Sequence, residues 1–280
     1  MKWVAYLRLM RFHKPAGILL LWLPTAWALW IANKGMPAFS LIVLFLVGTV
    51  LMRAAGCVVN DIADRHIDLH VKRTEKRPLT NGEVNLTGAL LLLFGLLFCA
   101  LMVLVQLPRT CFYYALLALF ITILYPFCKR FIQGPQLILG IAFSMGIPMA
   151  FAVSNAAVDS SLFYLLLINF LWIVAYDSQY AMADRADDLR IGVKSTAILF
   201  GDYDRVIIGL LQAIFHGLWF FLAPELNYSW AFFVCWLAAG LVLVYQQALI
   251  ASRLDVRCLQ AFSTNSLYGL LMWLAIILSL

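Results

Sequence analysis

The sequence predicts an all-α, polytopic membrane protein with about nine transmembrane helices in a single bundle. Of its residues, 64% are hydrophobic and only 12% are charged, about half the charged share of roughly 25% that is usual for a soluble domain. Apolar runs long enough to cross a bilayer recur along the whole chain. Nearly all of the Lys and Arg residues fall in alternate loops between these runs, which is typical of membrane topology.

The apolar runs define the predicted elements, because a transmembrane helix needs about 20 predominantly apolar residues. They cover residues 15–33, 38–59, 86–107, 111–127, 135–153, 161–180, 206–222, 229–250 and 263–280. The segments between the runs are too short to form a globular domain. Residues 1–280 are therefore expected to form one membrane domain.

The distribution of basic residues predicts the orientation of these helices. If the N-terminus starts in the cytoplasm and each run crosses the membrane, only Lys34 and Arg109 of the 20 basic residues lie on the outer side. Such an asymmetry supports nine crossings and a cytoplasmic N-terminus, because the loss of one crossing would place the later basic loops on the wrong side. The net charge of +6 is then explained by topology and by anionic lipid headgroups, and it does not indicate a nucleic-acid partner.

Two acidic clusters are the main functional signal. The first, Asn60-Asp61-x-x-Asp64-x-x-x-Asp68, follows the second apolar run. The second contains Asp177, Tyr180, Asp184, Asp187 and Asp188 and lies at the end of the sixth run. Carboxylates close to the membrane core are costly unless they are compensated, so they are functional candidates. Both clusters fall on the predicted cytoplasmic side and are four runs apart, which suggests a repeat of four helices plus a ninth helix.

The spacing within each cluster predicts where the carboxylates point. At about 100° per residue, Asn60, Asp64 and Asp68 lie within about 80° of one another if the helix continues through them. The members of the second cluster span about 100° in the same way. Two facing stripes of this kind form an oxygen-rich cage without His or Cys, which suits Mg²⁺ or Mn²⁺.

Basic residues surround the predicted cage. Metal-bound carboxylates combined with Lys and Arg are typical of sites that bind a diphosphate. The candidate diphosphate-binding residues are Lys72, Arg73, Arg77, Lys129, Arg130 and Lys194. A cation-coupled secondary transporter is the alternative from another class, because acidic residues between helices also mark ion pathways. The position of the acids at helix ends, beside a basic loop, favours the diphosphate.

The two clusters and their surroundings resemble the signatures of the UbiA-type intramembrane aromatic prenyltransferases. The first signature is matched by Asn60-Asp61-Ile-Ala-Asp64-Arg65-His-Ile-Asp68 and the basic run after it. The second is matched by Tyr176-Asp-Ser-Gln-Tyr-Ala-Met-Ala-Asp184-Arg-Ala-Asp187-Asp188 and Ile191-Gly-Val-Lys-Ser-Thr-Ala197. Ser178 stands where threonine is expected, with the hydroxyl kept. The resemblance covers the full chain and is strongest to the ubiquinone-pathway branch of the family.

The resemblance implies a helical bundle around a cavity that opens sideways to lipid. It implies Mg²⁺-dependent transfer of a polyprenyl group from polyprenyl diphosphate to the ring of 4-hydroxybenzoate, ortho to the hydroxyl. Another quinone or haem-type acceptor remains an alternative. The implied protein is a multi-pass protein of the bacterial inner membrane, with its active site on the cytoplasmic side, and its partners are these substrates and membrane lipids, without nucleic acid or an obligate protein partner.

The resemblance also assigns roles to individual residues. The metal ligands are Asn60, Asp64, Asp68, Asp184 and Asp188, and the catalytic set is the four aspartates of this group together with Arg130. For the acceptor, Arg65 is expected to hold the carboxylate, and Asp184 is expected to lie close to the phenol.

Overall fold

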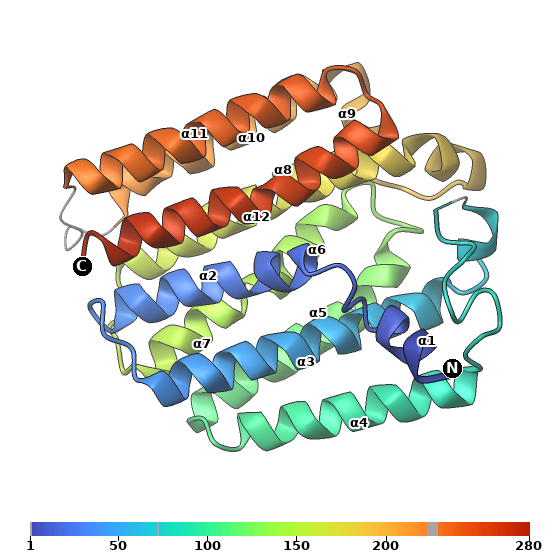
Figure 1. The fold of residues 1–280 in the computed structure, drawn as a ribbon, viewed down its shortest axis with the longest axis horizontal. Coiled ribbons are helices and arrows are strands. Elements are labelled where there is room, and N and C mark those ends of the chain that lie inside the picture. The colour runs from blue at the N-terminus through green and yellow to red at the C-terminus, as the bar shows by residue number, and fades with distance from the viewer. Residues whose placement is uncertain (1, 72, 223–228) are drawn as a thin grey trace.

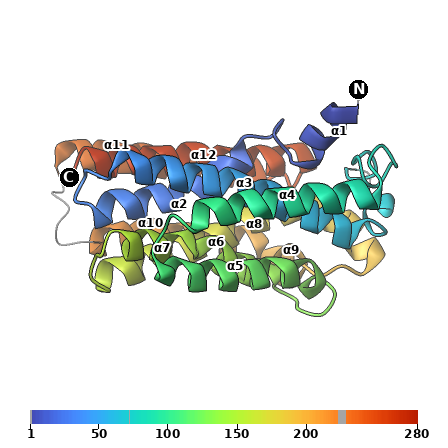
Figure 2. The same ribbon diagram turned by 90° about the horizontal axis from the view of Figure 1, so that it is seen from below.

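The computed structural model describes residues 2–71, 73–222 and 229–280, and in these ranges the secondary structure is helical. Long helices lie side by side and run back and forth along one direction (Figures 1 and 2). The long rods are α2 (Ala16–Ala32), α3 (Phe39–Asp64), α4 (Leu86–Leu104), α5 (Arg109–Cys128), α8 (Ser160–Ile191), α10 (Asp204–Leu218), α11 (Trp230–Ile250) and α12 (Asp255–Ile277). A further rod is divided into α6 (Pro135–Ser144) and α7 (Gly146–Val153).

Each of the predicted apolar runs overlaps one of these rods, and α3, α5, α8, α10 and α12 extend beyond the runs that predicted them. Within the described residues, six segments are long and apolar enough to cross a membrane: α3, α4, α5, the α6–α7 rod, α8 and α11. Helix α2 is a shorter apolar helix. Helix α10 packs on α8 and α11, and α12 packs on α2, α8 and α11. The expected all-α membrane bundle is therefore confirmed, with nine as an approximate number of crossings, whereas the repeat of four helices plus one stays a prediction.

The shorter elements lie at the ends of the bundle. Helix α1 (Lys2–Leu9) packs against α3, and α9 (Thr196–Phe200) follows α8. Single 3₁₀ turns occur at Asp68–His70, Gly201–Tyr203 and Trp219–Phe221. The N-terminal helix and the loop that follows α3 lie at the same end of the molecule (Figure 1).

The break between α6 and α7 has a local cause. Pro148 lacks the amide hydrogen that a continuous helix would donate to the preceding turn, which weakens the helix at this point. Gly146 stands directly after the break, and a Cβ added to it would lie 2.1 Å from Oγ1 of Thr25 in α2. The absence of a side chain therefore allows α7 to approach α2 closely.

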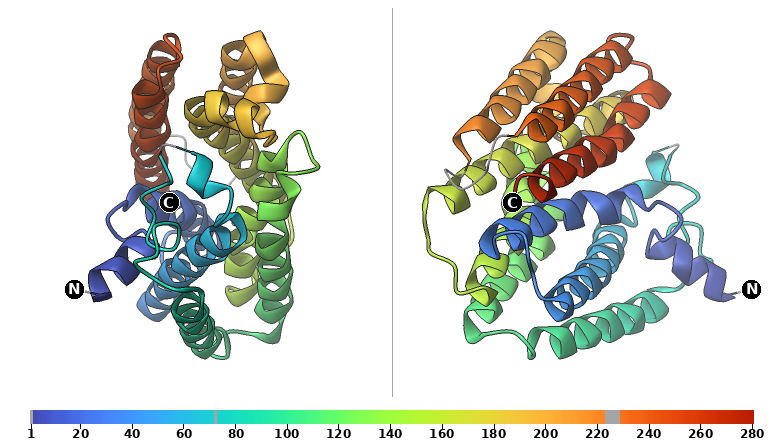
Figure 3. Two further views of the ribbon diagram at one scale, coloured as in Figure 1. Left: turned by 90° about the vertical axis from the view of Figure 1, so that its right-hand side faces the viewer. Right: turned by 60° about the vertical axis from the view of Figure 1, so that its left-hand side comes forward.

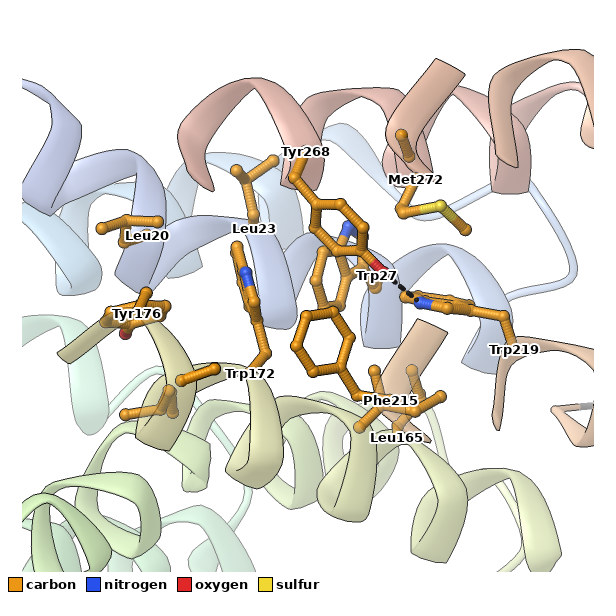
Figure 4. Close-up of a cluster of buried hydrophobic side chains, with 14 of the residues drawn as sticks. Leu20, Leu23, Trp27, Leu165, Trp172, Tyr176, Phe215, Trp219, Tyr268 and Met272 are labelled. Carbon is orange, nitrogen blue, oxygen red and sulfur yellow. Dashed lines mark hydrogen bonds between the residues drawn. The ribbon is translucent and has the colours of Figure 1, made fainter. Parts of the chain in front are cut away.

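An aromatic cluster holds α2, α8 and α12 together (Figure 4). The rings of Trp27 and Trp172 lie 5.0 Å apart, and Nε1 of Trp27 donates a hydrogen bond of 3.1 Å to the backbone oxygen of Gly269. A Cβ at Gly269 would lie 2.6 Å from Leu23 and 2.9 Å from Trp172. The cluster thus fixes the helix that carries the second acidic motif.

Buried amide side chains reinforce the same half of the bundle. Nδ2 of Asn265 donates to Oε1 of Gln179 at 2.9 Å, and Oε1 of Gln246 accepts from Gln179 at 3.1 Å and from Gln212 at 2.7 Å. These residues come from α12, α8, α11 and α10. Inside a membrane, such hydrogen bonds contribute roughly 0.6 kcal/mol each, and up to about 2 kcal/mol.

Candidate active site

A cavity of about 960 Å³ lies between the helices of the first half of the bundle and α8. Its polar end is lined by residues of both acidic motifs and by several Lys and Arg side chains. The remainder is lined mostly by Leu, Phe, Met and Ala from α2, α3, α4, α5 and the α6–α7 rod. The cavity therefore has a charged end and a long apolar end.

The first motif reaches the cavity from the end of α3 and the turn after it. Nζ of Lys129, at the end of α5, lies 3.3 Å from Oδ1 of Asn60 and 3.2 Å from Oδ2 of Asp64. The condition that the helix continues through Asp68 is not met, because α3 ends at Asp64. Asp68 instead begins a 3₁₀ turn, and its Oδ2 accepts a hydrogen bond of 2.6 Å from Arg77. That ion pair turns Asp68 back towards the cavity.

The second motif lies on one uninterrupted helix. Helix α8 continues to Ile191 and stops at Gly192, which has the left-handed backbone (φ 73°) that favours glycine at a helix end. Asp184 and Asp188 line the cavity, and so does Tyr180. Asp187 does not belong to this lining and pairs instead with Arg190 on the outside, at 3.0 Å.

The loop after α3 connects the two motifs. Nε of Arg73 donates to Oδ1 of Asp184 at 2.8 Å, and Nη2 donates to Oδ2 of the same carboxylate. The guanidinium also lies 4.7 Å from the centre of the Tyr180 ring. The residues of the two motifs, which are more than one hundred positions apart, therefore face one another across the polar end of the cavity.

Asp61 has a different role from its neighbours. It is fully buried, and Oδ1 accepts hydrogen bonds from Arg11 at 2.6 Å and from Arg77 at 3.1 Å. It does not contribute to the cavity lining. Asp61 thus ties the N-terminal segment and the basic loop to α3, and Arg77 bridges Asp61 and Asp68.

Burial and neighbouring charges shift the pKa values of two side chains at this end of the bundle. Burial raises the pKa of Asp68, partly offset by the adjacent Arg77. Burial and the nearby cations Arg73 and Arg11 lower the pKa of Lys14, which lines the cavity. A bound anion would relieve the repulsion around Lys14.

The donor set fits a hard divalent cation. Oδ1 of Asp64 is buried and accepts no hydrogen bond, while Oδ2 pairs with Lys129. Among the described residues, no group of three or more acidic, His or Cys side chains is close enough to hold a metal as it stands. Because Lys129 and Arg73 already neutralise Asp64 and Asp184, a metal would take over carboxylate oxygens that these cations hold here.

The structure brings most of the predicted site residues together. The cavity lining includes Asn60, Asp64, Asp68, Asp184, Asp188, Arg73, Arg77, Lys129 and Lys194. Lys194 also donates through Nζ to the backbone oxygen of Phe131 at 3.0 Å. Lys72 lies outside the described residues.

Two predicted residues are not found in the described cavity lining. Arg130 is exposed at the end of α5, where Nη2 reaches the backbone oxygen of Ala63 at 3.4 Å. Arg65 donates to the backbone oxygen of Ile62 at 3.1 Å and likewise does not line the cavity. The geometry therefore offers no support for a catalytic role of Arg130 or for Arg65 as the acceptor's anchor.

The structure adds Arg53 to the candidates and supports Asp177, which belongs to the second acidic cluster. Both line the cavity, and no ion pair joins either of them to another described side chain. A Cβ on Gly17 would lie 2.5 Å from Nη2 of Arg53, so the guanidinium is accommodated by this glycine. The sequence signal that could have identified Arg53 is its spacing from Asn60. The two residues are seven positions apart, which is about two helical turns, so both lie on the same face of α3.

Known proteins are similar to this chain in sequence and in fold. Residues 21–276 match the UbiA prenyltransferase family. The chain is 58% identical to 4-hydroxybenzoate octaprenyltransferase of Legionella pneumophila (strain Corby), over 99% of both chains. It is 48% identical to the protein of the same name from Coxiella burnetii (strain CbuK_Q154), over 98% of this chain and 96% of that one.

Two solved structures are similar in fold. A UbiA homologue from Aeropyrum pernix K1 superposes with a TM-score of 0.79 at 23% identity, covering 93% of this chain and 97% of that one. A UbiA homologue from Archaeoglobus fulgidus bound to GPP and Mg²⁺ gives 0.72 at 20% identity, covering 96% and 99%. The matched motifs, the full-length identity and the fold agree, and the chain belongs to the UbiA prenyltransferase family.

Proposed function

We propose that this protein is a 4-hydroxybenzoate polyprenyltransferase, which transfers a polyprenyl group to the ring carbon ortho to the hydroxyl. The observation that carries this proposal is the cavity itself, in which two aspartate motifs and a set of cations meet at one end of a long apolar space. A polyprenyl diphosphate has the same division into a highly charged head and an apolar tail. The relatives at 58% and 48% identity are named for an octaprenyl donor and 4-hydroxybenzoate, which supports both substrates.

Mg²⁺ is the proposed cofactor. Asn60, Asp64, Asp68, Asp184 and Asp188 would hold it, because all five supply oxygen atoms at the polar end of the cavity. When bound, the metal neutralises the diphosphate and makes it a better leaving group. The unpartnered Oδ1 of Asp64 and the Mg²⁺ present in the Archaeoglobus fulgidus homologue support this choice.

The cations of the site would bind the rest of the diphosphate charge. Arg73 and Lys129 hold carboxylates in this structure, and both can turn towards phosphate oxygens once a metal occupies those carboxylates. Lys14, Arg77 and Lys194 also line this end of the cavity. Such preorganised charge favours breakage of the bond between the allylic carbon and the diphosphate oxygen, because it stabilises the negative charge that develops on the leaving group.

The acceptor's carboxylate needs a cation that the diphosphate site does not use. Arg53 meets this requirement, because it lines the cavity on α3, about two turns from Asn60, without an ion-pair partner among the described side chains. Arg53 would hold the carboxylate and turn the ring towards the allylic carbon. A new carbon–carbon bond then forms ortho to the hydroxyl, and that ring carbon loses its proton.

Asp177 is the proposed acceptor of this proton. It lines the same cavity, and it is not held in an ion pair by any described residue, unlike Asp64 or Asp184. The predicted position of Asp184 near the phenol remains compatible with this scheme, because Asp177 and Asp184 lie seven residues apart on α8 and share a face. The apolar walls exclude water, which would otherwise capture the allylic cation.

We place the site on the cytoplasmic side of a bacterial inner membrane. The basic loops and both aspartate motifs lie at one end of the bundle (Figure 1). Lys34 lies in the connection between α2 and α3, and Arg109 begins α5 after the connection from α4. Both of these connections lie at the opposite end of the bundle. This arrangement follows the distribution expected for a cytoplasmic face. A transporter is disfavoured because the acids lie at helix ends beside a basic loop, whereas transporter sites lie near the midplane in broken helices.

The test is an assay of the purified protein in detergent or lipid nanodiscs with radiolabelled 4-hydroxybenzoate, octaprenyl diphosphate and Mg²⁺. We expect an organic-soluble, labelled product that does not form with EDTA and forms again when Mg²⁺ is restored. Absence of product with 4-hydroxybenzoate, but formation with another phenolic or haem-type acceptor, would reject the acceptor. Absence of product with every donor and acceptor would reject the transferase.

A further inference from the structure

The hydroxyl of Tyr176 is buried at the cavity without a partner. The side chain comes from α8, is only 2% exposed and lines the cavity. Its hydroxyl forms no hydrogen bond with any described residue. A buried hydroxyl of this kind is costly, because it gives up hydrogen bonds to water and gains none in return. A bound molecule that supplies an acceptor oxygen would remove this cost.

Packing holds the ring of Tyr176 in place. The ring meets Trp172 edge-on, with 5.3 Å between the ring centres, and its centre lies 5.7 Å from that of Phe262. Tyr176 stands at one end of the aromatic cluster, next to Trp172 (Figure 4). Both of these contacts involve the ring and neither uses the hydroxyl. The ring is therefore anchored, while the hydroxyl stays available to a ligand.

Tyr176 lies deeper in the bundle than the proposed metal ligands. Helices α3 and α8 both end at the polar end of the cavity, where the segment after α3 stands in front of the helices in the end-on view (Figure 3, left). Tyr176 precedes Asp184 by eight residues on α8, which corresponds to about 12 Å. Arg53 precedes Asn60 by seven residues on α3, which corresponds to about 10 Å. Tyr176 and Arg53 are therefore at similar depth.

Arg53 and Tyr176 reach the same part of the cavity from different helices. The charge of Arg53 acts on the Tyr176 hydroxyl, which requires the two groups to be near each other. The guanidinium of Arg53 lies against Gly17 of α2, and Leu20, about one turn farther along α2, lines the same cavity. A cation and a neutral hydrogen-bond donor are thus placed together, which suits a carboxylate.

We propose that the hydroxyl of Tyr176 donates a hydrogen bond to the carboxylate of the acceptor, beside Arg53, and so selects acceptors that carry an oxygen at this position. The inference rests on the proposed function and adds a binding residue to it. At bond lengths near 1.5 Å, 4-hydroxybenzoate measures about 6 Å from its carboxyl carbon to its phenol oxygen. With the carboxylate held at Tyr176, the phenol points towards Asp184 and the ring lies between them.

Arg53 and Tyr176 recognise different properties of the carboxylate. The guanidinium attracts its negative charge, whereas the tyrosine hydroxyl needs only an oxygen that accepts a hydrogen bond. 4-Hydroxybenzamide keeps such an oxygen and lacks the charge, and 4-methylphenol lacks both. A comparison of these two compounds with 4-hydroxybenzoate therefore separates the contribution of Tyr176 from that of Arg53.

Tyr268 provides a matched control. It is buried in the same aromatic cluster (Figure 4), but its hydroxyl accepts a hydrogen bond of 3.0 Å from Nε1 of Trp219, and it does not belong to the described cavity lining. Tyr268→Phe removes that hydrogen bond and should lower the melting temperature of the purified protein. Tyr176→Phe removes a hydroxyl without a partner and should not. A comparable fall in Tyr176→Phe would show that its hydroxyl is engaged within the protein and would contradict the proposal.

The kinetic experiment compares Tyr176→Phe and Tyr268→Phe with the unaltered protein, using Mg²⁺, octaprenyl diphosphate and each of the three acceptors. In Tyr176→Phe, KM for 4-hydroxybenzoate should rise by about 10- to 100-fold, the effect of losing a hydrogen bond to a charged group, while KM for the donor stays unchanged. Its kcat/KM should also fall with 4-hydroxybenzamide and should equal that of the unaltered protein with 4-methylphenol. Tyr268→Phe should match the unaltered protein with all three. An unchanged KM for 4-hydroxybenzoate in Tyr176→Phe, or an equal loss with 4-methylphenol, would overturn the proposal.

A binding measurement separates the site from the reaction. Calorimetric titration of 4-hydroxybenzoate into protein saturated with Mg²⁺ and pyrophosphate should show weaker binding in Tyr176→Phe and in Arg53→Gln. The double variant should lose less than the product of the two single losses, because both residues hold one carboxylate. If no acceptor is prenylated but this pattern persists, the reaction is wrong and the binding site stands. If 4-hydroxybenzoate is prenylated and binds equally well to Tyr176→Phe, the proposed function stands and the role of Tyr176 is rejected.

Discussion

Nζ of Lys129 lies 3.2 Å from Oδ2 of Asp64, so a lysine at the end of α5 occupies one oxygen of the carboxylate proposed to bind metal. The other oxygen, Oδ1, is buried and accepts no hydrogen bond. The ammonium and a divalent cation therefore compete for the same side chain. When metal and diphosphate bind together, Lys129 loses a carboxylate partner and can gain a phosphate partner.

The first prediction follows from this competition. Lys129→Gln should bind a divalent cation more tightly in the absence of donor, by several fold, because no ammonium has to be displaced. The same variant should use polyprenyl diphosphate about 10- to 100-fold less well, which is the effect of losing one charge-assisted hydrogen bond. Mn²⁺ titration followed by electron paramagnetic resonance, and steady-state kinetics with varied donor, measure the two effects. Lys76→Gln, in the exposed loop, is the control, and unchanged Mn²⁺ affinity in Lys129→Gln would contradict the competition.

The second prediction separates residues within one motif. Asp64→Asn and Asp184→Asn should each reduce kcat by at least about 100-fold, the scale seen when a preorganised electrostatic group is removed from an active site. Asp187→Asn should retain near-normal activity, because Asp187 pairs with Arg190 outside the cavity. Activity of purified variants with matched thermal stability provides the measurement. Comparable losses at positions 184 and 187 would mean that the helix face is assigned wrongly.

The third prediction concerns the acceptor. Arg53→Gln should raise KM for 4-hydroxybenzoate by about 10- to 100-fold, because a buried carboxylate loses its charge-assisted partner. The KM for polyprenyl diphosphate should change little. An acceptor in which an amide replaces the carboxylate should be used equally by Arg53→Gln and by the unaltered protein. Arg65→Gln serves as the comparison, since Arg65 does not line the cavity. A larger rise in KM for 4-hydroxybenzoate in Arg65→Gln than in Arg53→Gln would favour Arg65 as the anchor of the acceptor's carboxylate.

Helical periodicity predicted the central part of the site from the sequence. Asn60 and Asp64 are four residues apart on α3, and Asp184 and Asp188 are four residues apart on α8, so each pair has to share a face. The uninterrupted α8 makes this argument hold for Asp177, Tyr180, Asp184 and Asp188, but not for Asp187, which pairs with Arg190 outside the cavity. It fails for Asp68, because the helix ends at Asp64 and an ion pair with Arg77, nine residues later, determines where Asp68 points. The spacing of residues along a helix cannot predict this ion pair, because Arg77 lies in the loop after the helix.

The proposed anchor of the acceptor's carboxylate, Arg53, differs from Arg65, which the family resemblance implies, and helix geometry separates the two residues. Arg65 directly follows Asp64, but one residue turns a helix by about 100° and places Arg65 on another face. Arg53 is farther away in sequence and returns to the face of Asn60 after about two turns. A single Arg near the end of an apolar run, such as Arg53, is also typical of a topology determinant. Its sequence context alone therefore fits either a topological role or a binding role. Only the cavity lining distinguishes them.

The fourth prediction concerns which side of the membrane the site faces. Glu75 lies exposed in the loop that follows the first motif, and Asn155 lies exposed in the turn at the other end of the bundle, after α7. In a background without native cysteines, Glu75→Cys should react with an impermeant maleimide only in inverted inner-membrane vesicles, and Asn155→Cys only in right-side-out vesicles. Mg²⁺ with pyrophosphate should slow labelling at position 75, because Arg73 and Arg77 of the same loop line the cavity, and should leave position 155 unchanged. Labelling of both positions from the same side would contradict an odd number of crossings between them. It would also remove the basis for placing the site where a soluble acceptor and diphosphate donors made in the cytoplasm can reach it.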